Sequence, residues 1–271
     1  MTTTVETESP ITGASAASEA FGFSWYELHT PDAGAAEAFY KPVLGWGTQD
    51  TGMPGRKYIL VSVDETPIGG LLEKPASAFA DGEKPRWVGY IGLRDLAKSC
   101  ERLQKAGGTL HRPAEQIPGV GTFAVVADPE GAVVVLFQPA DGASRPEQPP
   151  TCTPGMPVWH ELAADDLDST FRFYADLFGW TKVHELDMGP NGIYQMFGTG
   201  GGPIGGMMRR MNAAQHTGWL FYFHVEGIEA AMDRVKQHGG TVVFGPSPIP
   251  GDAQIAHCLD RGGALFGIVG R

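Results

Sequence analysis

The stretch FSWYELHTPDAGAAEAFYKPVLGW, residues 23–46, occurs a second time as PVWHELAADDLDSTFRFYADLFGW, residues 157–180. Tryptophan, glutamate, leucine, aspartate and the Phe-Tyr and Gly-Trp pairs recur in the same order. The offset between the copies is 134 residues, both from Trp25 to Trp159 and from the Trp46 that ends the first copy to its counterpart. A repeat of this length matches a small domain and is too long for a solenoid unit. The sequence therefore predicts a tandem duplication.

Each repeat is predicted to contain two βαβββ modules. Residues 23–30 alternate as a strand, Asp32 is predicted to be the helix N-cap, and the helix 33–44 is expected to end at Gly45. Three short strands follow in the pattern, and the same order then starts again. The other expected elements are 47–50, 57–63, 68–72, 87–93, 95–106, 109–112, 122–127 and 133–137, with 158–163, 167–178, 219–225, 228–237 and 265–269 in the second repeat.

Composition excludes several classes of protein. The chain has 271 residues, 42% of them hydrophobic, which is enough for two packed cores. Its 20 basic and 31 acidic side chains give a net charge of −11, which disfavours nucleic-acid or anionic-membrane partners. The sequence contains no run of 18 apolar residues, so no membrane span is predicted. The 3 cysteines form no CxxC pair and are predicted to be reduced thiols of a cytoplasmic protein.

The domain organisation follows from the repeat. Residues 1–20 are rich in Thr, Ser, Ala and Glu, lack the features of a signal peptide and predict a disordered tail. Residues 21–138 form the first predicted domain, 139–156 a Pro-rich extended linker, and 157–271 the second domain. A tandem repeat can complete within one chain what a single repeat would complete by dimerising, so a monomer is expected, with a homodimer as the alternative.

These motifs resemble the vicinal oxygen chelate superfamily, which includes glyoxalase I, bleomycin-resistance proteins and extradiol dioxygenases. The resemblance covers both repeats and includes the DPEG turn at residues 128–131 before an apolar strand. The WxEL motif that opens each repeated stretch and the Gly-Trp pair that closes it are most similar to those of two-domain glyoxalase-like proteins. The resemblance implies an α+β fold of tandem domains, each built of two βαβββ modules with a curved mixed sheet around a concave pocket. It says little about the reaction, because one fold hosts many chemistries.

The metal site that the resemblance implies lacks its ligands here. In metal-using relatives the first strand carries His or Gln, the fifth strand His, and the strand after the DPxG turn Glu. The corresponding residues are Trp25, Val88 and Val135 in the first repeat and Trp159, Leu220 and Gly267 in the second. The fourth ligand would fall in the PIGG strands, whose register stays open. A zinc, nickel or iron site needs three or four donors, so no metal cofactor is predicted.

The concave face of each repeat is nevertheless predicted to carry polar side chains. Side chains alternate along a strand, so residues two apart share a face. The lining predicted in this way is Trp25, Glu27, His29 and Tyr90 in the first repeat and Trp159, Glu161, Tyr222 and His224 in the second. The same alternation sends Tyr26 and Leu28 under the helix and His160 to the back of the sheet. His111, His184, His216, His238 and His257 are expected in solvated loops or helix ends.

Each lining residue has a functional and a structural interpretation. A carboxyl group in an aromatic pocket suits a general acid or base, so Glu27 and Glu161 are the predicted catalytic residues. The tyrosines could orient a substrate oxygen, and the tryptophans could stack on a planar ligand. Alternatively, each glutamate only braces the sheet, and His29 and His224 only satisfy local hydrogen bonds.

Three functions remain open at this stage. The first is a metal-independent enzyme of lyase, isomerase or hydrolase type that acts on a small oxygenated metabolite. The second is a binding or resistance protein that sequesters an aromatic small molecule. The third is a metal-dependent lactoylglutathione lyase or dioxygenase with displaced ligands such as His29, His224, Glu27 and Glu161. The sequence leaves open whether a pocket forms within one repeat or between the two.

Overall fold

The computed structural model describes residues 20–142, 150–211 and 218–271, and side chains throughout except at 21 and 80–82. The predicted disordered tail, apart from Ala20, lies outside the described residues, as do His216 and residues 143–149 of the predicted linker. The N-terminal half consists of β1 (Ala20–Thr30), α1 (Ala33–Leu44), β2 (Gly47–Asp50), β3 (Tyr58–Val63), β4 (Thr66–Glu73), η1 (Ala76–Gly82), β5 (Arg86–Leu93), α2 (Leu96–Lys105), β6 (Thr109–Ile117), β7 (Gly121–Ala127) and β8 (Val133–Pro139). The C-terminal half consists of β9 (Pro157–Ala164), α3 (Leu167–Phe178), β10 (Thr181–Asp187), η2 (Gly189–Asn191), β11 (Ile193–Gly198), β12 (Pro203–Arg209), β13 (Gly218–His224), α4 (Ile228–Gln237), β14 (Thr241–Ile249), β15 (Ala253–Leu259) and β16 (Leu265–Gly270).

Each half forms its own mixed sheet, which confirms the predicted α+β fold of two tandem domains. The strand orders are β2-β3-β4-β1-β5-β8-β7-β6 and β10-β11-β12-β9-β13-β16-β15-β14. The central strand β1 pairs parallel with β4 and antiparallel with β5, and β9 pairs in the same way with β12 and β13. Because every strand of a sheet comes from one half, each concave face is built within one half.

The helix boundaries follow from capping residues in the sequence. The Asp32 side chain accepts a hydrogen bond from the Ala35 backbone N–H, and Gly45 ends α1 with a φ of 76°. Asp166 and Gly179, the latter at a φ of 70°, do the same for α3. Only glycine adopts this left-handed conformation without strain, so the repeated Gly-Trp pair fixes where each helix stops.

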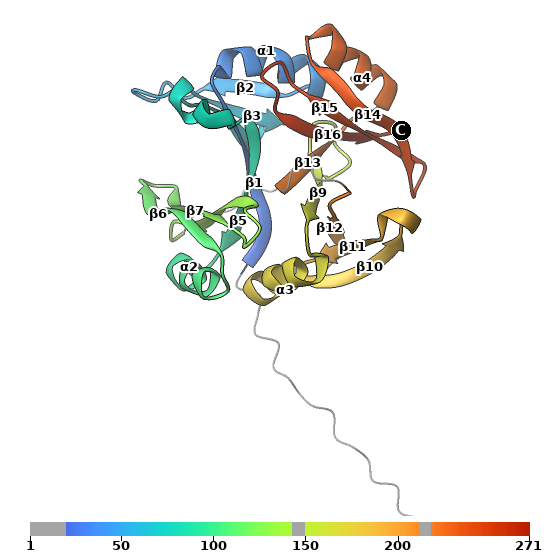
Figure 1. Ribbon diagram of the computed structural model, residues 1–271. Helices are drawn as coiled ribbons and strands as arrows, with labels where there is room; N and C mark the ends of the chain where they lie inside the picture. The colour runs from blue at the N-terminus through green and yellow to red at the C-terminus, as the bar shows by residue number, and fades with distance from the viewer. Residues whose placement is uncertain (1–19, 143–149, 212–217) are drawn as a thin grey trace, which may run out of the picture.

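The two halves pack against each other through the backs of their central strands (Figure 1). Helix α1 lies beside α4, and α2 lies beside α3, so each pair joins elements of different halves. The two concave faces therefore turn away from one another and open on opposite sides of the molecule, left and right in Figure 1. No helix within the described residues has the length and apolar character needed to cross a membrane.

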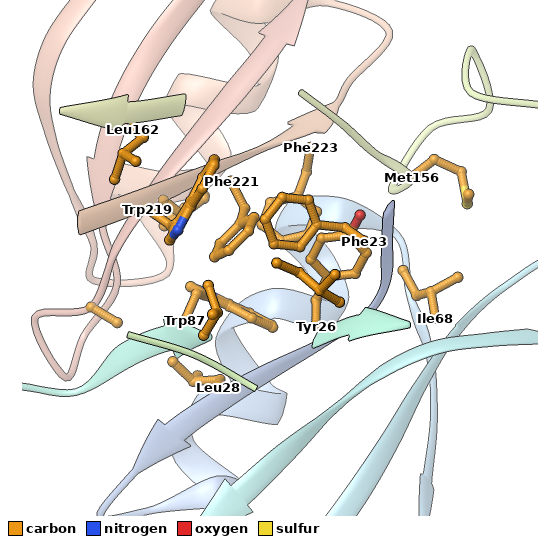
Figure 2. Packing of buried hydrophobic residues seen from close by; sticks show 14 of the residues in the cluster. Phe23, Tyr26, Leu28, Ile68, Trp87, Met156, Leu162, Trp219, Phe221 and Phe223 are labelled. Carbon is orange, nitrogen blue, oxygen red and sulfur yellow. The ribbon is translucent and has the colours of Figure 1, made fainter. Parts of the chain in front are cut away.

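An aromatic cluster fills the centre of this interface (Figure 2). The Phe23 ring stacks on His160, with centroids 4.4 Å apart, and meets Trp219 edge-on at 5.0 Å. The Tyr26 hydroxyl lies 2.6 Å from His160 Nε2. The prediction that Tyr26 packs under the helix is therefore wrong, because its ring crosses to the other half, whereas His160 lies at the back as predicted. Burial lowers the pKa of His160 to about 4, so this imidazole stays neutral.

Two equivalent tyrosine–aspartate bonds also join the halves. The Tyr40 hydroxyl donates to Asp260 and the Tyr174 hydroxyl donates to Asp128, each at 3.1 Å. Asp128 is the first residue of the DPEG turn, and its other side-chain oxygen accepts the N–H of Ala132. Burial raises the pKa of both aspartates. The DPEG motif and the Phe-Tyr pair of the repeat thus form one contact between halves.

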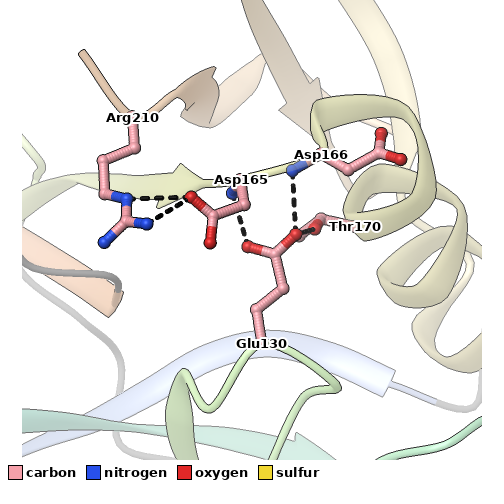
Figure 3. A network of polar contacts seen from close by, with 5 residues as sticks. All are labelled: Glu130, Asp165, Asp166, Thr170 and Arg210. Atoms are coloured by element: carbon pink, nitrogen blue, oxygen red, sulfur yellow. Dashed lines mark hydrogen bonds and ion pairs between the residues drawn. The ribbon is translucent and has the colours of Figure 1, made fainter. Parts of the chain in front are cut away.

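A third contact between the halves is centred on Glu130 (Figure 3). The Glu130 side chain accepts the backbone N–H of Asp166 at 2.9 Å and the Thr170 hydroxyl at 3.1 Å. The neighbouring Asp165 forms an ion pair with Arg210. The residue at the corresponding position of the second repeat is Gly262, which has no side chain to make the reciprocal contact.

Candidate functional site

The N-terminal concave face gathers polar and aromatic side chains around one buried glutamate. Strand β1 presents Trp25, Glu27 and His29 on one face, as the alternation predicts, and Glu27 is only 6% exposed. The Trp25 indole N–H donates to the Tyr58 hydroxyl at 3.1 Å, and Tyr58 and Tyr90 both interact with Glu27. Burial, reinforced by the Glu27 charge, raises the pKa of both tyrosines, so they stay protonated and donate hydrogen bonds.

His29 is bonded to this glutamate. Its Nε2 lies 2.8 Å from Glu27 Oε1, and both side chains are buried. Since a carboxylate only accepts, this bond needs a proton on Nε2. Burial lowers the pKa of His29, and the attraction of Glu27 opposes that shift only in part, so the imidazole is neutral at pH 7. Its Nδ1 makes no hydrogen bond to any described residue, and the ring lines a small surface crevice.

The C-terminal concave face repeats most of this arrangement. The Trp159 indole donates to the Tyr194 hydroxyl at 2.7 Å, and that hydroxyl donates to Glu161 at 3.1 Å. Tyr222 also bonds Glu161, and its oxygen lies 2.7 Å from His257 Nε2. Position 163, the counterpart of His29, is alanine, so Glu161 has no histidine partner of that kind.

Tyr58 and Tyr194, which connect tryptophan to glutamate in each half, were not among the residues predicted from the sequence. Each phenol ring lies over a glycine of the PIGG motif, Gly70 or Gly206, where a Cβ atom would overlap the ring. These glycines pair directly with Glu27 and Glu161 across the sheet. A signal was present, because the tyrosine precedes its glycine by 12 residues in both repeats.

Replacing Gly206 with alanine should displace the Tyr194 ring and break its bonds to Trp159 and Glu161. We expect a loss of about 1–3 kcal/mol in the free energy of unfolding, because the site is tightly packed and the added methyl group meets a ring. Gly201→Ala, in the β11–β12 turn where nothing lies within 4 Å of the new Cβ, is the matched control. Equal stability of the two variants in urea titrations would show that the glycine does not seat the tyrosine.

Three histidines expected in loops or at helix ends lie on strands instead, and two of them, His111 on β6 and His184 on β10, are exposed as expected. The prediction that His257 is solvated in a loop is wrong, because it lies on β15 against Tyr222, and burial lowers its pKa. His224 lies at the end of β13, where its backbone pairs with Gly155 and Met156. Its Nδ1 is buried without a hydrogen-bond partner among the described residues, and nothing joins it to Glu161. The predicted lining of this half thus comes together except for His224.

Burial raises the pKa of Glu161, although hydrogen bonds from Tyr194 and Tyr222 oppose the shift. A carboxyl group whose folded pKa is raised binds a proton more readily in the folded state, so stability falls as pH rises from the unfolded toward the folded pKa. Glu161→Gln should remove this loss. We therefore expect the variant to gain stability relative to the wild type between pH 4.5 and pH 8, measured by urea unfolding at several pH values. A constant difference across this range would contradict the prediction.

The donor set on these faces does not match a metal site. The positions that would hold three of the ligands carry tryptophan, valine, leucine or glycine, and the PIGG glycines paired with the two glutamates, Gly70 and Gly206, supply no side-chain donor. Glu27 and His29 supply two donors. Across the part of the chain that the structure describes, no group of three or more His, Cys, Asp or Glu side chains could hold a metal ion.

Comparison with known families agrees with the fold. The model of the Glyoxalase/Bleomycin resistance protein/Dioxygenase superfamily matches residues 22–136 and again residues 157–268. The chain belongs to this superfamily. It is 29% identical over 251 residues to a Mycobacterium bovis protein, CFP32, whose name describes it as a glyoxylase. The alignment covers 91% of this chain and 93% of the relative. It is 26% identical over 261 residues to the anthracycline biosynthesis protein DnrV of Streptomyces peucetius, covering 91% and 92%.

Solved structures of the superfamily share the fold at low identity. The Mn(II)-bound glyoxalase from Novosphingobium aromaticivorans matches with a TM-score of 0.66 and 14% identity, over 93% of this chain and 83% of the other. The 2,3-dioxygenase LapB from Pseudomonas sp. KL28 matches with a TM-score of 0.62 and 16% identity, over 94% of each chain. At such identities the likeness concerns architecture alone, so a function must be argued from the two concave faces.

Proposed function

We propose that the N-terminal concave face is an acid–base catalytic site, in which the Glu27–His29 pair moves a proton of a small oxygenated metabolite. The reaction would be of lyase, isomerase or hydrolase type. The observation that carries this proposal is the 2.8 Å bond between the two buried side chains, with His29 Nδ1 left without a partner among the described residues. A neutral imidazole held in one tautomer by a carboxylate suits a general base.

The roles of the individual groups follow from their bonds. Glu27 accepts from His29, Tyr58 and Tyr90, so its oxygens are largely occupied. His29 Nδ1 would take the proton, and the adjacent carboxylate would stabilise the imidazolium that forms. Positioned proton transfer of this kind contributes roughly 10²–10⁴-fold in rate. The sequence suggested Glu27 as the base, whereas these contacts support His29 as the base and Glu27 as the group that orients it.

We further propose that this chemistry needs no divalent metal, since the donors on either face are too few for a catalytic site. Purified protein should contain much less than one equivalent of metal, and turnover should survive treatment with EDTA. Loss of turnover in EDTA that Mn²⁺ or Zn²⁺ restores would instead support the metal-dependent lyase or dioxygenase alternative.

A second candidate function concerns the C-terminal face, which supports binding of a planar aromatic molecule. Phe244 is 49% exposed, and its ring centroid lies 5.0 Å from that of His257 on the same face as Trp159. The resemblance to an anthracycline biosynthesis protein is consistent with such a ligand. Titration with an anthracycline, monitored by the quenching of tryptophan fluorescence, tests this candidate. Phe244→Ala should weaken the binding of the anthracycline.

Separate replacement of the two glutamates distinguishes the candidates. Turnover of a panel of small oxo and hydroxy compounds, including lactoylglutathione, should fall in Glu27→Gln while ligand affinity persists. If only Glu161→Gln loses turnover, catalysis belongs to the other half. If both variants change affinity and neither changes turnover, the protein is a binder.

A further inference from the structure

A cationic crevice lies beside the Glu27–His29 pair, where the ends of β1 and β4 meet η1 and the start of β5. Its walls are His29, Lys74, Ala78, Phe79, Glu83, Lys84 and Arg86. Three of these side chains are cations and one is a carboxylate, in a protein whose net charge is −11. Positive charge is thus concentrated next to the proposed catalytic pair, against the charge of the whole chain.

Lys74 and Lys84 are the cations of this crevice that form no ion pair among the described residues, and Lys74 is the more buried of the two. Glu83 is already paired with Arg86 at 2.5 Å, and no ion pair of Lys74 occurs among the described residues. Lys74 is half-buried, and burial lowers its pKa, with Glu27 opposing the shift and Arg86, Arg112 and Arg56 adding to it. A partly desolvated ammonium group without a salt bridge is stabilised when an anion binds beside it.

Within its described residues, the C-terminal half has no such cluster. The counterpart of Lys74 is Arg210, whose backbone N–H bonds Ala164 as that of Lys74 bonds Thr30, but its guanidinium is paired with Asp165. The counterparts of Arg86 and Arg112 are Gly218 and Phe244. The two concave faces share the Trp-Tyr-Glu arrangement, so the cations distinguish the N-terminal one.

We propose that this crevice binds the anionic group, a carboxylate or a phosphate, of the molecule on which the N-terminal half acts. Lys74 and Arg86 would hold the oxygens, and the Phe79 ring would contact an apolar part of the same molecule. The inference rests on the proposed function, because an anion bound here brings the adjoining carbon of the ligand toward His29. The substrate class is then a small organic anion.

Calorimetric titration of the full chain with benzoate, and separately with inorganic phosphate, tests the proposal without any catalytic assay. Lys74→Met should weaken binding of the anion at least about 10-fold, and Lys74→Met with Arg86→Met should abolish it. Arg210→Met, at the equivalent position of the other half, should bind within about 2-fold of the wild type. Thermal unfolding of each variant checks that the fold is retained.

The outcomes separate this proposal from the catalytic one. Benzoate binding stronger than phosphate binding identifies a carboxylate as the anion, and the reverse identifies a phosphate. Wild-type affinity in Lys74→Met, or no binding of either probe to the wild type, overturns the crevice proposal. Glu27→Gln removes a negative charge and should bind the anion slightly more tightly, so anion binding with unchanged turnover in this variant would overturn the catalytic proposal alone.

Discussion

Phe23→Ala should lower the free energy of unfolding by about 3–5 kcal/mol, the range for truncating a buried aromatic side chain. Phe23 is 6% exposed, and its ring contacts His160, Trp219 and Phe221 of the other half. The Tyr26 ring of the same strand also lies near Phe23, but the other surrounding rings belong to the other half, so a cavity is expected to remain. Urea unfolding followed by tryptophan fluorescence measures the loss.

Phe244→Ala is the matched control, since that phenylalanine is 49% exposed and its removal should change stability by less than about 0.5 kcal/mol. Because the core is shared, the wild type should unfold in one transition. A loss below about 1 kcal/mol for Phe23→Ala, or two separate transitions in the wild type, would show that the halves are stabilised independently.

His29→Asn should reduce kcat by roughly 10²–10⁴-fold with little change in KM, if His29 is the proton acceptor. Asparagine retains a hydrogen-bond donor for Glu27 but cannot accept a proton at neutral pH. Steady-state kinetics on a substrate identified from the panel of oxo and hydroxy compounds provide the measurement. His111→Asn, an exposed strand histidine on β6, is the control and should keep full activity.

The same assignment fixes the direction of the pH dependence. A base must be unprotonated, and burial lowers the pKa of His29 below 6.5, so activity should be at its plateau at pH 7 and fall only in more acidic solution. His29→Asn should lose this acidic limb together with its activity. A wild-type rate that keeps rising from pH 7 to pH 9 would contradict His29 as the base.

Local signals in the sequence predicted the fold well. The N-cap aspartates and the glycines after each helix set the ends of α1 and α3, and the duplicated motif set the symmetry of the two halves. The edge strands were harder, since β6 extends to Ile117, beyond the expected 109–112, and the sequence pattern gave no bounds for β14. Prolines argue against a strand in the middle of a sheet but are tolerated at its edge, and sequence alone does not reveal which strands are edges.

Strand alternation predicted which residues of β1 and β9 share a face, because that property is local. The partners that these residues meet depend on pairing between strands far apart in the chain. Tyr58 reaches Glu27 only because Gly70 leaves room for its ring, and His257 reaches Tyr222 across β16. The passage of Tyr26 into the other half likewise depends on how the domains pack, which no periodicity in the sequence encodes.

Nitrogen-15 NMR of the His29 imidazole tests the central claim most directly, since it needs neither a substrate nor an assay. We predict a neutral ring at pH 7 with the proton on Nε2 and none on Nδ1, a pKa below 6.5, and a still lower pKa in Glu27→Gln. A proton on Nδ1, an imidazolium persisting above pH 7, or a titration that Glu27→Gln leaves unchanged would contradict the account.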